Sequence, residues 1–399
     1  STPIDLSTRT NVFQNANRGL CELHVPSGSL FAYKNAVEWK DFGYISTPTQ
    51  VMRNINNMTA GTLSSLIDPI YRSSVTHLFI SGHVDARDFK TMRDSLALLA
   101  HVDISNATID SYSGNLGTRT GSFVYDTNTV PAYAFYNVDT RTPKTTLSIL
   151  NLPDNIVRFG YMAYFYCANL FSINIPESLQ TIDQLVFSNS GNLLQVNISA
   201  ATTTIGVEAF GSFNGYISID EQNPNYTVAD GVLFNKQMTT LMACPVTKTG
   251  SYNVPLSVTL ITRSAFAKCS GLTGTIELPN GLTSINDYVF FRCTNIERVV
   301  IPESVTSIGV AAFFECLKLN EIYSYSATPL EFEADDAIFE RVDKTSCVLY
   351  VPLGASTDYA SATEWEEFSN ILEINGIRLS GNKRSIDANQ NSTALPVEL

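Results

Sequence analysis

The chain has 399 residues, of which 44% are hydrophobic and only 16% charged, and its formal net charge at pH 7 is −13. Nucleic acids and anionic membranes are bound by basic surfaces, so this charge argues against both as partners. The stretch 157–175 is fairly apolar, but Arg158, Asn169 and Asn174 interrupt it, and no membrane insertion is expected.

The first element is a module at residues 1–48 that occurs twice in the chain. Residues 1–45 align without gaps on 327–371, and both copies carry Cys, Val-Pro, Tyr and Trp at matching positions. The later copy follows the repeats, so we expect residues 327–374 to form a C-terminal cap, with a polar tail at 375–399. Two interpretations of the early copy stay open: the end of an upstream stack missing from this chain, which we favour, or a separate small lid.

The next segment predicts two strands with a helix between them. Runs at 75–81 and 102–105 alternate apolar and polar residues, as half-buried strands do. Between these runs Phe89, Met92 and Leu96 recur at helical spacing, so we expect an amphipathic helix that opens the stack.

From residue 159 to residue 319 one phrase recurs. In its clearest copy, counted from Gly309, a small residue falls at +3, an aromatic at +4, Cys at +7 and Leu at +10. Copies in the same frame begin at Gly160, Thr262 and Asn286, and degenerate ones at Asp183 and Gly206. In the copy at Gly206 the Leu position is filled by Tyr216. The aromatic positions recur about every 23 residues, and a period of this size indicates stacked repeats.

Each repeat also carries a second signal, Leu-x-x-Ile-x-Ile-Pro, as at 170–176 and 296–302. The alternation is that of a half-buried strand, and the Pro closes the strand. The return path after the Pro has too few residues for a long helix. We therefore expect β-rich coils of about 23 residues, each with one parallel strand and short helical turns.

One interval departs from the period. The chain from Phe210 to Phe266 is long enough for one coil and an excursion, which we place at 221–255. Turn signals at Asp230-Gly231 and at 249–250 flank β-type runs there. We interpret this segment as a hairpin that leaves the stack and returns to it.

The segment at 301–319, Ile-Pro-Glu-Ser-Val-Thr-Ser-Ile-Gly-Val-Ala-Ala-Phe-Phe-Glu-Cys-Leu-Lys-Leu, resembles the BspA-type leucine-rich repeat of bacterial surface proteins, found especially in Bacteroides relatives. The match is specific over about 150–326 and looser upstream, through 130–135. The resemblance implies an α/β repeat solenoid over 49–326, a right-handed, β-rich superhelix. It also implies adhesion to host matrix proteins or to other bacteria, without identifying the ligand.

The residues that could carry chemistry form no catalytic or metal-binding motif. Four of the seven cysteines share one repeat position: Cys167, Cys269, Cys293 and Cys316. Because Ser190 and Phe213 fill this position in other coils, we interpret the cysteines as core residues rather than disulfides or metal ligands. The four histidines lack recurring ligand spacing, and no hydrolase, zinc-protease or phosphate-binding motif occurs. We expect no enzyme activity, no catalytic residues, no metal and no cofactor.

The candidate binding surface is the outward side of the strands, which is polar and mildly acidic. Its predicted members, coil by coil, are Ser172 and Asn174, Gln195 and Asn197, Ser218 and Asp220, Thr275 and Glu277, Arg298 and Val300, and Glu321 and Tyr323. One interpretation is a solvated sheet face, and the sharper one is a recognition surface for a protein or a glycan. The excursion at 221–255 is the other candidate.

Two functions follow from these observations. The leading hypothesis is a secreted or cell-surface protein that mediates protein–protein interaction or adhesion, to host matrix or to a bacterial partner, with its signal or lipid anchor removed. The alternative is a glycan-binding accessory protein in polysaccharide capture. It needs aromatic platforms on the exposed face, and the predicted set contains only Tyr323.

Overall fold

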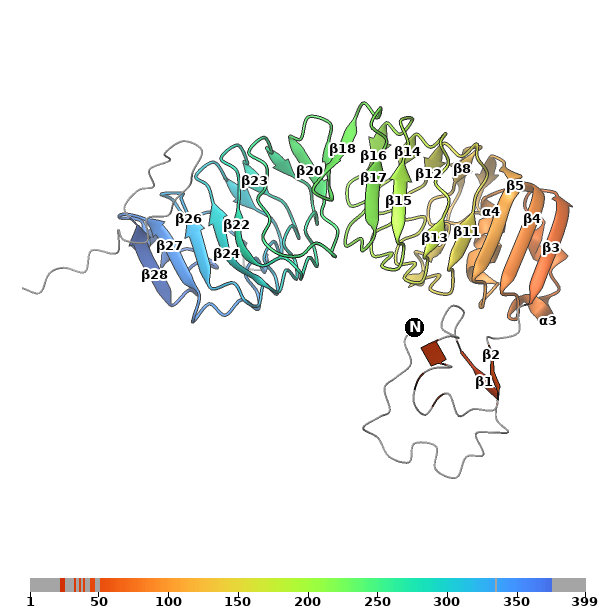
Figure 1. Ribbon diagram of the computed structural model, residues 1–399, viewed down its shortest axis with the longest axis horizontal. Coiled ribbons are helices and arrows are strands. Elements are labelled where there is room, and N and C mark those ends of the chain that lie inside the picture. The colour runs from red at the N-terminus through yellow and green to blue at the C-terminus, as the bar shows by residue number, and fades with distance from the viewer. Residues whose placement is uncertain are drawn as a thin grey trace, which may run out of the picture.

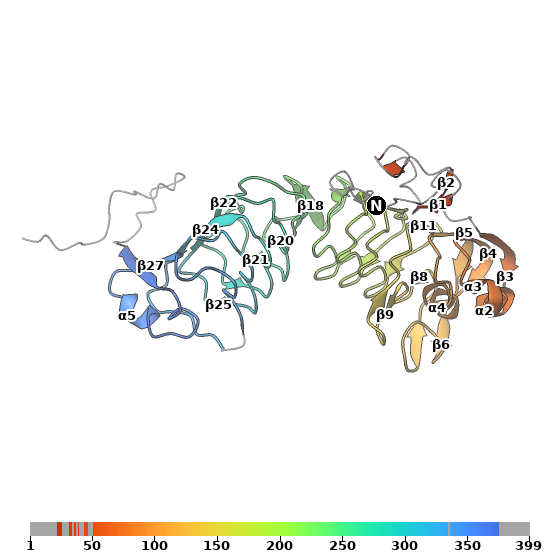
Figure 2. The ribbon, with the colours of Figure 1, turned by 90° about the horizontal axis from the view of Figure 1, so that it is seen from below.

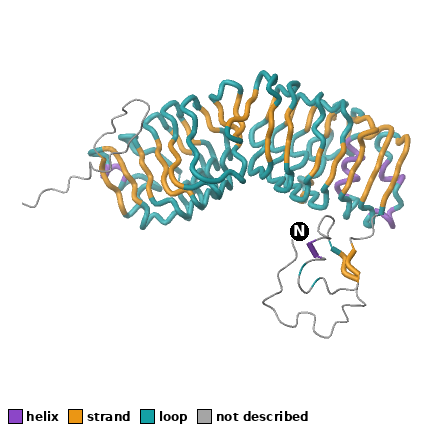
Figure 3. The backbone as a smooth tube through the Cα atoms, viewed as in Figure 1, coloured by secondary structure: helices purple, strands orange, loops and turns teal. Residues whose placement is uncertain are grey.

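The computed structural model describes residues 51–333 and 336–374, and in the first module only positions 22–25, 32–33, 36, 39 and 44–46. From residue 51 onward the described chain winds into an arched stack of coils (Figure 1). Short strands and turns make up most of it, with few helices (Figure 3). The repeat phrase predicts such a β-rich solenoid, and the structure confirms it. The tail expected at 375–399 lies outside the described residues.

The longest strands of the coils lie side by side and form one face of the solenoid. In stack order they are β3 (Met52–Met58), β4 (His77–Val84), β5 (His101–Ile109), β11 (Ile149–Asn151), β13 (Ser172–Ile173), β15 (Gln195–Ile198), β17 (Tyr216–Ile219), β22 (Gly274–Glu277), β24 (Ile296–Ile301), β26 (Glu321–Ser324), β27 (Val348–Pro352) and β28 (Asn370–Ile374). They form parallel sheets of five, two and five strands. Side chains alternate across a strand, so buried residues such as Val196 and Val299 enter the core. The residues between them form the outer surface, which we call the strand face.

Each regular coil also has a two-residue strand on its return path, in addition to the one strand per coil that the sequence predicts. These strands are β8 (Thr129–Val130), β12 (Arg158–Phe159), β14 (Thr181–Ile182) and β16 (Thr204–Ile205), and then β21 (Leu260–Ile261), β23 (Ser284–Ile285) and β25 (Ser307–Ile308). Each row pairs in parallel, and the second residue of every strand is buried. A tight turn follows each one, as at 160–166 and 309–315. These turns line another side of the solenoid, the turn face.

The aromatic residues of the phrase form a ladder of rings along the core. Neighbouring centroids lie 5.1 to 6.0 Å apart, with ring planes 7° to 19° from parallel, in the pairs Phe135–Tyr164, Tyr164–Phe187, Phe187–Phe210, Phe266–Phe290, Phe290–Phe313 and Phe313–Phe339. The phrase identifies the rungs from Tyr164 to Phe313, and the structure adds Phe135 and Phe339 at the two ends. Such stacking favours a constant coil spacing, because each ring packs on the ring of the next coil.

The helix expected near the start of the stack is present as α4 (Ala86–Asp94). Asp85 and Asp88 form a capping box at its beginning, which satisfies backbone N–H groups that the first turn leaves unpaired. Phe89 and Met92 are buried, as predicted. The other helices between residues 51 and 374 that the structure describes are single turns: α2 (Leu63–Leu66), α3 (Pro69–Arg72) and α5 (Ser356–Tyr359).

The excursion predicted at 221–255 is shorter than expected. β18 (Tyr226–Ala229) and β19 (Val232–Asn235) form the antiparallel hairpin that the turn signal predicts. The chain then rejoins the stack at β20 (Thr240–Ala243), which pairs in parallel with β21. The phrase misses this additional coil because Cys244 occupies the place of the aromatic ring: its N–H donates to the carbonyl of Ala265, as the N–H of Phe266 donates to the carbonyl of Val289.

The hairpin lies between a first half (51–219) and a second half (240–374) of the stack (Figure 2). Each half has its own hydrophobic core, and Ala243 of β20 packs in the core of the first half. Successive residues of β19 point to opposite sides. Leu233 therefore enters the core of the first half, whereas Val232 and Phe234 enter that of the second. The aromatic ladder is interrupted at this seam.

The C-terminal module extends the stack and ends with a buried tryptophan. β27 and β28 continue the strand face. Trp365 is fully buried, and its ring lies 5.1 Å from that of Phe339 and 5.3 Å from that of Tyr359. The indole N–H donates to the carbonyl of Leu330 at 3.0 Å. The indole thus covers the last rung of the ladder.

The few described positions of the first module show the same geometry. β1 (Glu22–His24) pairs in parallel with β2 (Tyr44–Ser46), in a register equivalent to that of β27 with β28. The rings of Tyr33 and Trp39 meet edge to face at 5.4 Å, as those of Tyr359 and Trp365 do at 5.3 Å. Most of residues 1–48 lies outside the described positions, so their assignment as a cap-like module stays a prediction.

Candidate functional site

The strand face is most continuous in the second half of the stack. Parallel pairing places Val300, Tyr323 and Tyr350 in register across three neighbouring strands, and Leu372 follows on β28. The rings of Tyr323 and Tyr350 stack at 4.3 Å. Val300, Tyr323, Tyr350 and Leu372 therefore form one apolar and aromatic row, which we call the strand-face row. Val300 and Tyr323 are buried, whereas Tyr350 is half-buried and Leu372 is exposed, so the last two are the accessible members of the row.

A charged pair borders this row. Arg298 lies opposite Glu321 and forms an ion pair with it, and the guanidinium lies 5.6 Å from the centre of the Tyr323 ring. Burial and the carboxylate of Glu321 raise the pKa of the Tyr323 hydroxyl. Of the predicted residues in this region, Arg298, Val300, Glu321 and Tyr323 come together. The expectation that all four are exposed is wrong for Val300 and Tyr323, which are buried. The Tyr350 ring and the Arg298 guanidinium both pack on the Tyr323 ring. Sequence reasoning missed Tyr350, because it belongs to the duplicated module rather than to the repeat phrase.

The next two predicted residues are further along the same face. Thr275 lies opposite Arg298, and Glu277 lies opposite Val300. Both side chains are half-buried. They extend the strand-face row toward the seam with polar groups.

In the middle of the stack the predicted residues bind one another. Gln195 and Ser218 both donate hydrogen bonds to the side-chain oxygen of Asn197. Asp220 lies beyond this group, and its carboxylate accepts a hydrogen bond from the N–H of Gln222 at 2.8 Å, which closes a turn. Gln195, Asn197 and Ser218 thus form one polar cluster.

One expectation in this coil is wrong. Tyr216, assigned to the buried Leu position, is 58% exposed, and β-pairing places it opposite Gln195 on the strand face. Phe213 fills the core in place of Tyr216, so the strand of this coil begins earlier in the chain than the repeat phrase predicts. Gly215 permits the close approach, since a Cβ at this position would lie 2.2 Å from the carbonyl oxygen of Leu193.

In the first half the strand face contains a histidine pair that sequence reasoning did not assign to it. The rings of His77 and His101 lie 5.3 Å apart on neighbouring strands, and Phe79 lies 5.3 Å from His101. Burial lowers the pKa of both imidazoles, and the positive charge of His101 lowers that of His77 further. Only the pairing register brings these residues together.

The two predicted residues of this half have different surroundings. Ser172 lies exposed on β13, opposite Ile149. The amide of Asn174 is bonded to the backbone of Leu152, whose N–H it accepts at 2.6 Å and whose carbonyl receives its NH₂ group at 2.9 Å. Asn174 therefore joins two coils.

The described cysteines are all buried and unpaired: Cys167, Cys244, Cys269, Cys293, Cys316 and Cys347. Sequence reasoning treated the repeated ones as apolar, but they are also hydrogen-bond donors. The thiols of Cys293 and Cys316 donate to carbonyls of the preceding coil at 3.0 and 3.3 Å, and the Ser190 hydroxyl makes the equivalent bond at 2.7 Å. Burial raises the pKa of Cys167 to about 12, so this thiol is not a reactive thiolate at neutral pH.

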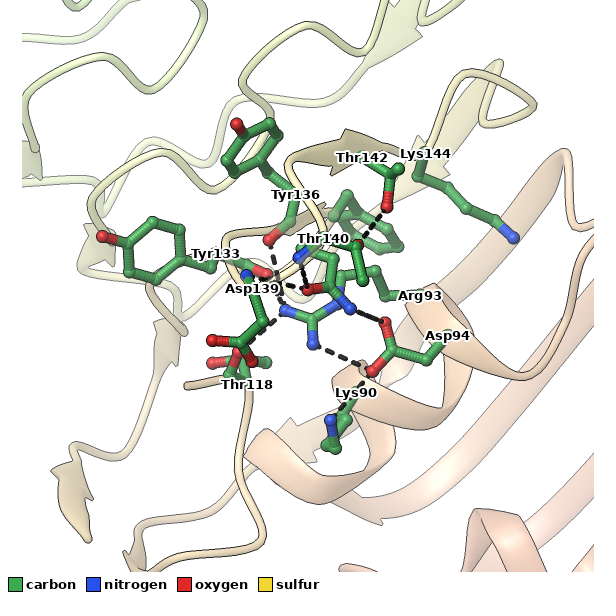
Figure 4. Close-up of polar contacts among 12 residues, drawn as sticks. Lys90, Arg93, Asp94, Thr118, Tyr133, Tyr136, Asp139, Thr140, Thr142 and Lys144 are labelled. Atoms are coloured by element: carbon green, nitrogen blue, oxygen red, sulfur yellow. Dashed lines mark hydrogen bonds and ion pairs between the residues drawn. The ribbon is translucent and has the colours of Figure 1, made fainter. Parts of the chain in front are cut away.

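A buried arginine fastens the loops that follow α4 (Figure 4). The Arg93 side chain is 2% exposed, and its Nη1 donates to the carbonyls of Thr118, Tyr133 and Tyr136 at 2.8, 2.8 and 3.2 Å. Asp94 forms a two-pronged ion pair with it. Burial raises the pKa of Asp94, but hydrogen bonds from Arg93 and Lys90 more than offset this and lower it to about 2.

Lys144 closes the same region from the other side. Its side chain is buried, and its Nζ donates to the carbonyl of Leu96, just beyond the end of α4. Burial lowers the pKa of Lys144 to about 8. Because this ammonium is bonded to backbone, we assign it a structural role.

The structure presents little that resembles a catalytic or metal centre. A cavity of about 30 Å³ at the seam, between Glu208, Phe210 and Met242, has room for about one water molecule. Small-molecule sites are usually ten times larger or more. Among the described residues there is no group of three His, Cys, Asp or Glu side chains placed to hold a metal ion. No helix in the described ranges is long and apolar enough to span a membrane.

The chain is similar to several solved structures, of which the first shares its fold. The crystal structure of the pneumococcal vaccine antigen PcpA is similar over 76% of this chain and 80% of that one, with a TM-score of 0.51 and 17% identity. A leucine-rich repeat protein from Eubacterium ventriosum matches 75% of this chain and 73% of its own, with a TM-score of 0.47 and 17% identity. A leucine-rich cell surface protein from Faecalibacterium prausnitzii matches 75% and 84%, with a TM-score of 0.38 and 18% identity.

No curated protein matches the chain. The family model described as the BspA type leucine-rich repeat region matches it in six copies, over residues 128–252 and 243–330. These ranges cover just over half of the chain and contain every copy of the repeat phrase, the ring ladder from Phe135 to Phe313, and the seam. The chain belongs to the BspA type leucine-rich repeat family.

Proposed function

We propose that this protein is a non-enzymatic scaffold outside the cell that binds another protein through its strand face. The observation that carries the proposal is the strand-face row of the second half, in which Val300, Tyr323, Tyr350 and Leu372 lie side by side in register. Tyr and Arg dominate the energetics of protein interfaces, and the row combines stacked tyrosines with Arg298. Repeat proteins use extended faces of this kind for recognition.

Adhesion outside the cell is the setting that fits this surface. PcpA, which shares the fold, is described as a vaccine antigen. The net charge of −13 keeps such a surface soluble and disfavours nucleic-acid partners. We include in the proposal an extracellular protein ligand, from host matrix or from another bacterium.

A binding panel with matched variants tests the proposal. The purified chain is immobilised and exposed to a panel of extracellular-matrix proteins, and the same panel is run on Arg298→Ala and Tyr350→Ala. Loss of about tenfold or more in affinity for the same ligand is expected, since a central interface residue contributes more than 1.4 kcal/mol.

The matched control is Lys318→Ala, which removes a charge from the same coil outside the strand face. We expect it to leave the affinity unchanged. Binding that survives both strand-face substitutions, or that falls equally in the control, contradicts the proposal.

A further inference from the structure

We propose that the turn face of the first half is a separate site for a carboxylate-bearing glycan, formed by the rings of Tyr136, Tyr161, Phe165 and Tyr166 and the guanidinium of Arg119. This site lies on a different side of the coils from the strand face and does not depend on the protein-binding function proposed above. The two proposals can therefore fail independently.

The first observation is a group of aromatic rings that does not belong to the core. Tyr136 meets Phe165 at 5.0 Å, and Phe165 meets Tyr166 at 4.6 Å. Tyr161 meets Tyr133 at 5.3 Å, and Tyr133 lies 6.5 Å from Tyr136. The rings come from two neighbouring coils and are half-buried to exposed, with Tyr166 at 43%, apart from Tyr133, which is buried. They form one connected aromatic surface, the turn-face cluster.

The ring geometry leaves aromatic faces open, although the Lys268 ammonium lies over the Tyr166 ring, 5.9 Å from its centre. Three of the contacts are edge to face, at 83° to 89° between planes, whereas the core ladder is nearly parallel. In an edge-to-face pair, the ring that presents its edge keeps both of its faces uncovered by that partner. A sugar ring has an apolar C–H face that packs on such a surface, and hydroxyl groups at its rim.

The tyrosine hydroxyls are available to those sugar hydroxyls. In the part of the chain that the structure describes, the hydroxyls of Tyr136, Tyr161 and Tyr166 take part in no intramolecular hydrogen bond. By contrast, the hydroxyls of Tyr112 and Tyr125, nearby in the chain, each accept a backbone N–H at 3.1 Å. The turn-face cluster therefore offers donors and acceptors beside open rings, which suits a polar, hydroxylated ligand better than an apolar peptide.

Arg119 supplies a positive charge next to the cluster. Its guanidinium lies 3.8 Å from the centre of the Phe123 ring and 5.6 Å from that of Tyr133, and it forms no ion pair with any described residue. Most other arginines of the stack, such as Arg158 and Arg292, are paired with a carboxylate. An arginine held flat by a ring and without an acid partner is well suited to two-pronged binding of a carboxylate.

The backbone under this surface is fixed before any ligand binds. The three carbonyls that Arg93 holds belong to Tyr133, to Tyr136 and to Thr118, which precedes Arg119 (Figure 4). The rings of Tyr133 and Tyr136 point to the same side, away from α4 (Figure 4). A rigid backbone lowers the entropy cost of ordering the site, which is what a weakly held sugar ligand requires.

Charge selects the class of glycan. A net charge of −13 disfavours heavily sulfated polysaccharides, which carry more than one negative charge per sugar. The unpaired guanidinium of Arg119, together with the Lys268 ammonium 5.9 Å from the centre of the Tyr166 ring, matches an oligosaccharide with one carboxylate per sugar, of the uronic-acid type.

Calorimetric titration of the full chain with an oligogalacturonate tests this inference, and a neutral maltooligosaccharide serves as the comparison ligand. We expect the acidic oligosaccharide to bind, the neutral one to bind at least tenfold more weakly, and Arg119→Gln to remove this preference. Tyr166→Ala should weaken binding of the acidic ligand at least tenfold, and Tyr166→Phe by less.

The matched control is Tyr288→Ala, which removes a half-buried tyrosine from the turn face of the second half and should leave binding unchanged. Circular dichroism establishes that each variant is folded. The proposal is overturned if neither oligosaccharide binds, if Arg119→Gln and Tyr166→Ala bind like the unmodified chain, or if a poly-glutamate peptide binds as tightly as the oligogalacturonate. That last result would assign the site to acidic protein segments.

Discussion

The two halves of the solenoid share the ring ladder and the strand face but differ in their irregular segments. The second half ends in a cluster of aromatic rings around Trp365, with its one indole N–H bonded to a carbonyl. The first half contains buried cations, Arg93 and Lys144, bonded to backbone carbonyls, whereas the buried Glu364 of the second half is paired with the Lys344 side chain. A regular coil satisfies its backbone through the neighbouring coil. A loop that interrupts the coil has carbonyls without such partners, and buried cations are one way to satisfy them.

The largest effect is expected at the aromatic end of the second half. Trp365→Ala should lower the free energy of unfolding by about 3 to 5 kcal/mol, because the ring is fully buried and leaves a cavity. Urea unfolding followed by circular dichroism measures this change. The control Leu353→Ala alters a side chain of the same module that is 61% exposed, and it should have little effect. An equal loss in both variants would contradict the prediction that this module caps the stack.

The corresponding test in the first half is Arg93→Met. It keeps most of the side-chain volume but leaves three carbonyls without their donor, and Asp94 keeps only the hydrogen bonds from Lys90 and Asn137. We therefore expect a loss of about 3 kcal/mol in the free energy of unfolding. Lys90→Met removes only the exposed partner of Asp94 and should cost less than about 1 kcal/mol. If the two variants unfold at the same urea concentration, the buried network does not hold this half together.

A smaller effect is expected from the regular coils, which the two halves share. Cys293→Ala should destabilise the protein by about 1 kcal/mol, because the carbonyl of Phe266 loses a hydrogen bond. Cys293→Ser should be nearly neutral, since Ser190 already makes the equivalent bond in the first half. Thermal unfolding of the two variants compares them directly, and equal stability would show that the thiol acts only by filling space.

The smallest expected effect is the pH dependence of stability that arises from two histidines of the first half. His77 and His101 have pKa values below the usual one of about 6.5, so at acidic pH the unfolded chain binds protons more readily than the folded chain. The contribution of these histidines to the free energy of unfolding is therefore fully present above about pH 6.5, and it falls as the pH decreases below this value. His101→Gln should reduce the drop in unfolding free energy between pH 7.5 and pH 5.5. An unchanged drop would mean that other groups cause it.

Much of the fold could be predicted from spacing alone. The positions of Gly309, Phe313 and Cys316 in the phrase are a local pattern, and one pattern per coil is sufficient to predict a stack. Cys244 shows the limit of prediction from spacing. It occupies the aromatic position of a true coil, which is revealed by its hydrogen bond to Ala265 and by the pairing of β20 with β21.

The candidate site could be predicted from the sequence less completely than the fold. Arg298, Glu321 and Tyr323 could be placed on one face because strand alternation is a local property. Tyr216 and Tyr350 could not, because their places depend on a shortened turn and on the pairing of a different module with the last coil. The turn-face cluster was not predicted either, since Tyr161, Phe165 and Tyr166 fill positions that vary from coil to coil.

The sequence by itself determined that this protein is a solenoid of β-rich coils with a buried ladder of rings and thiols, because apolar periodicity within a coil is a short-range property of the chain. The tertiary structure decided which residues meet across coils: the histidine pair, the stacked tyrosines, and the three carbonyls on Arg93. Those contacts depend on pairing register and on loops of irregular length, which no repeat period encodes.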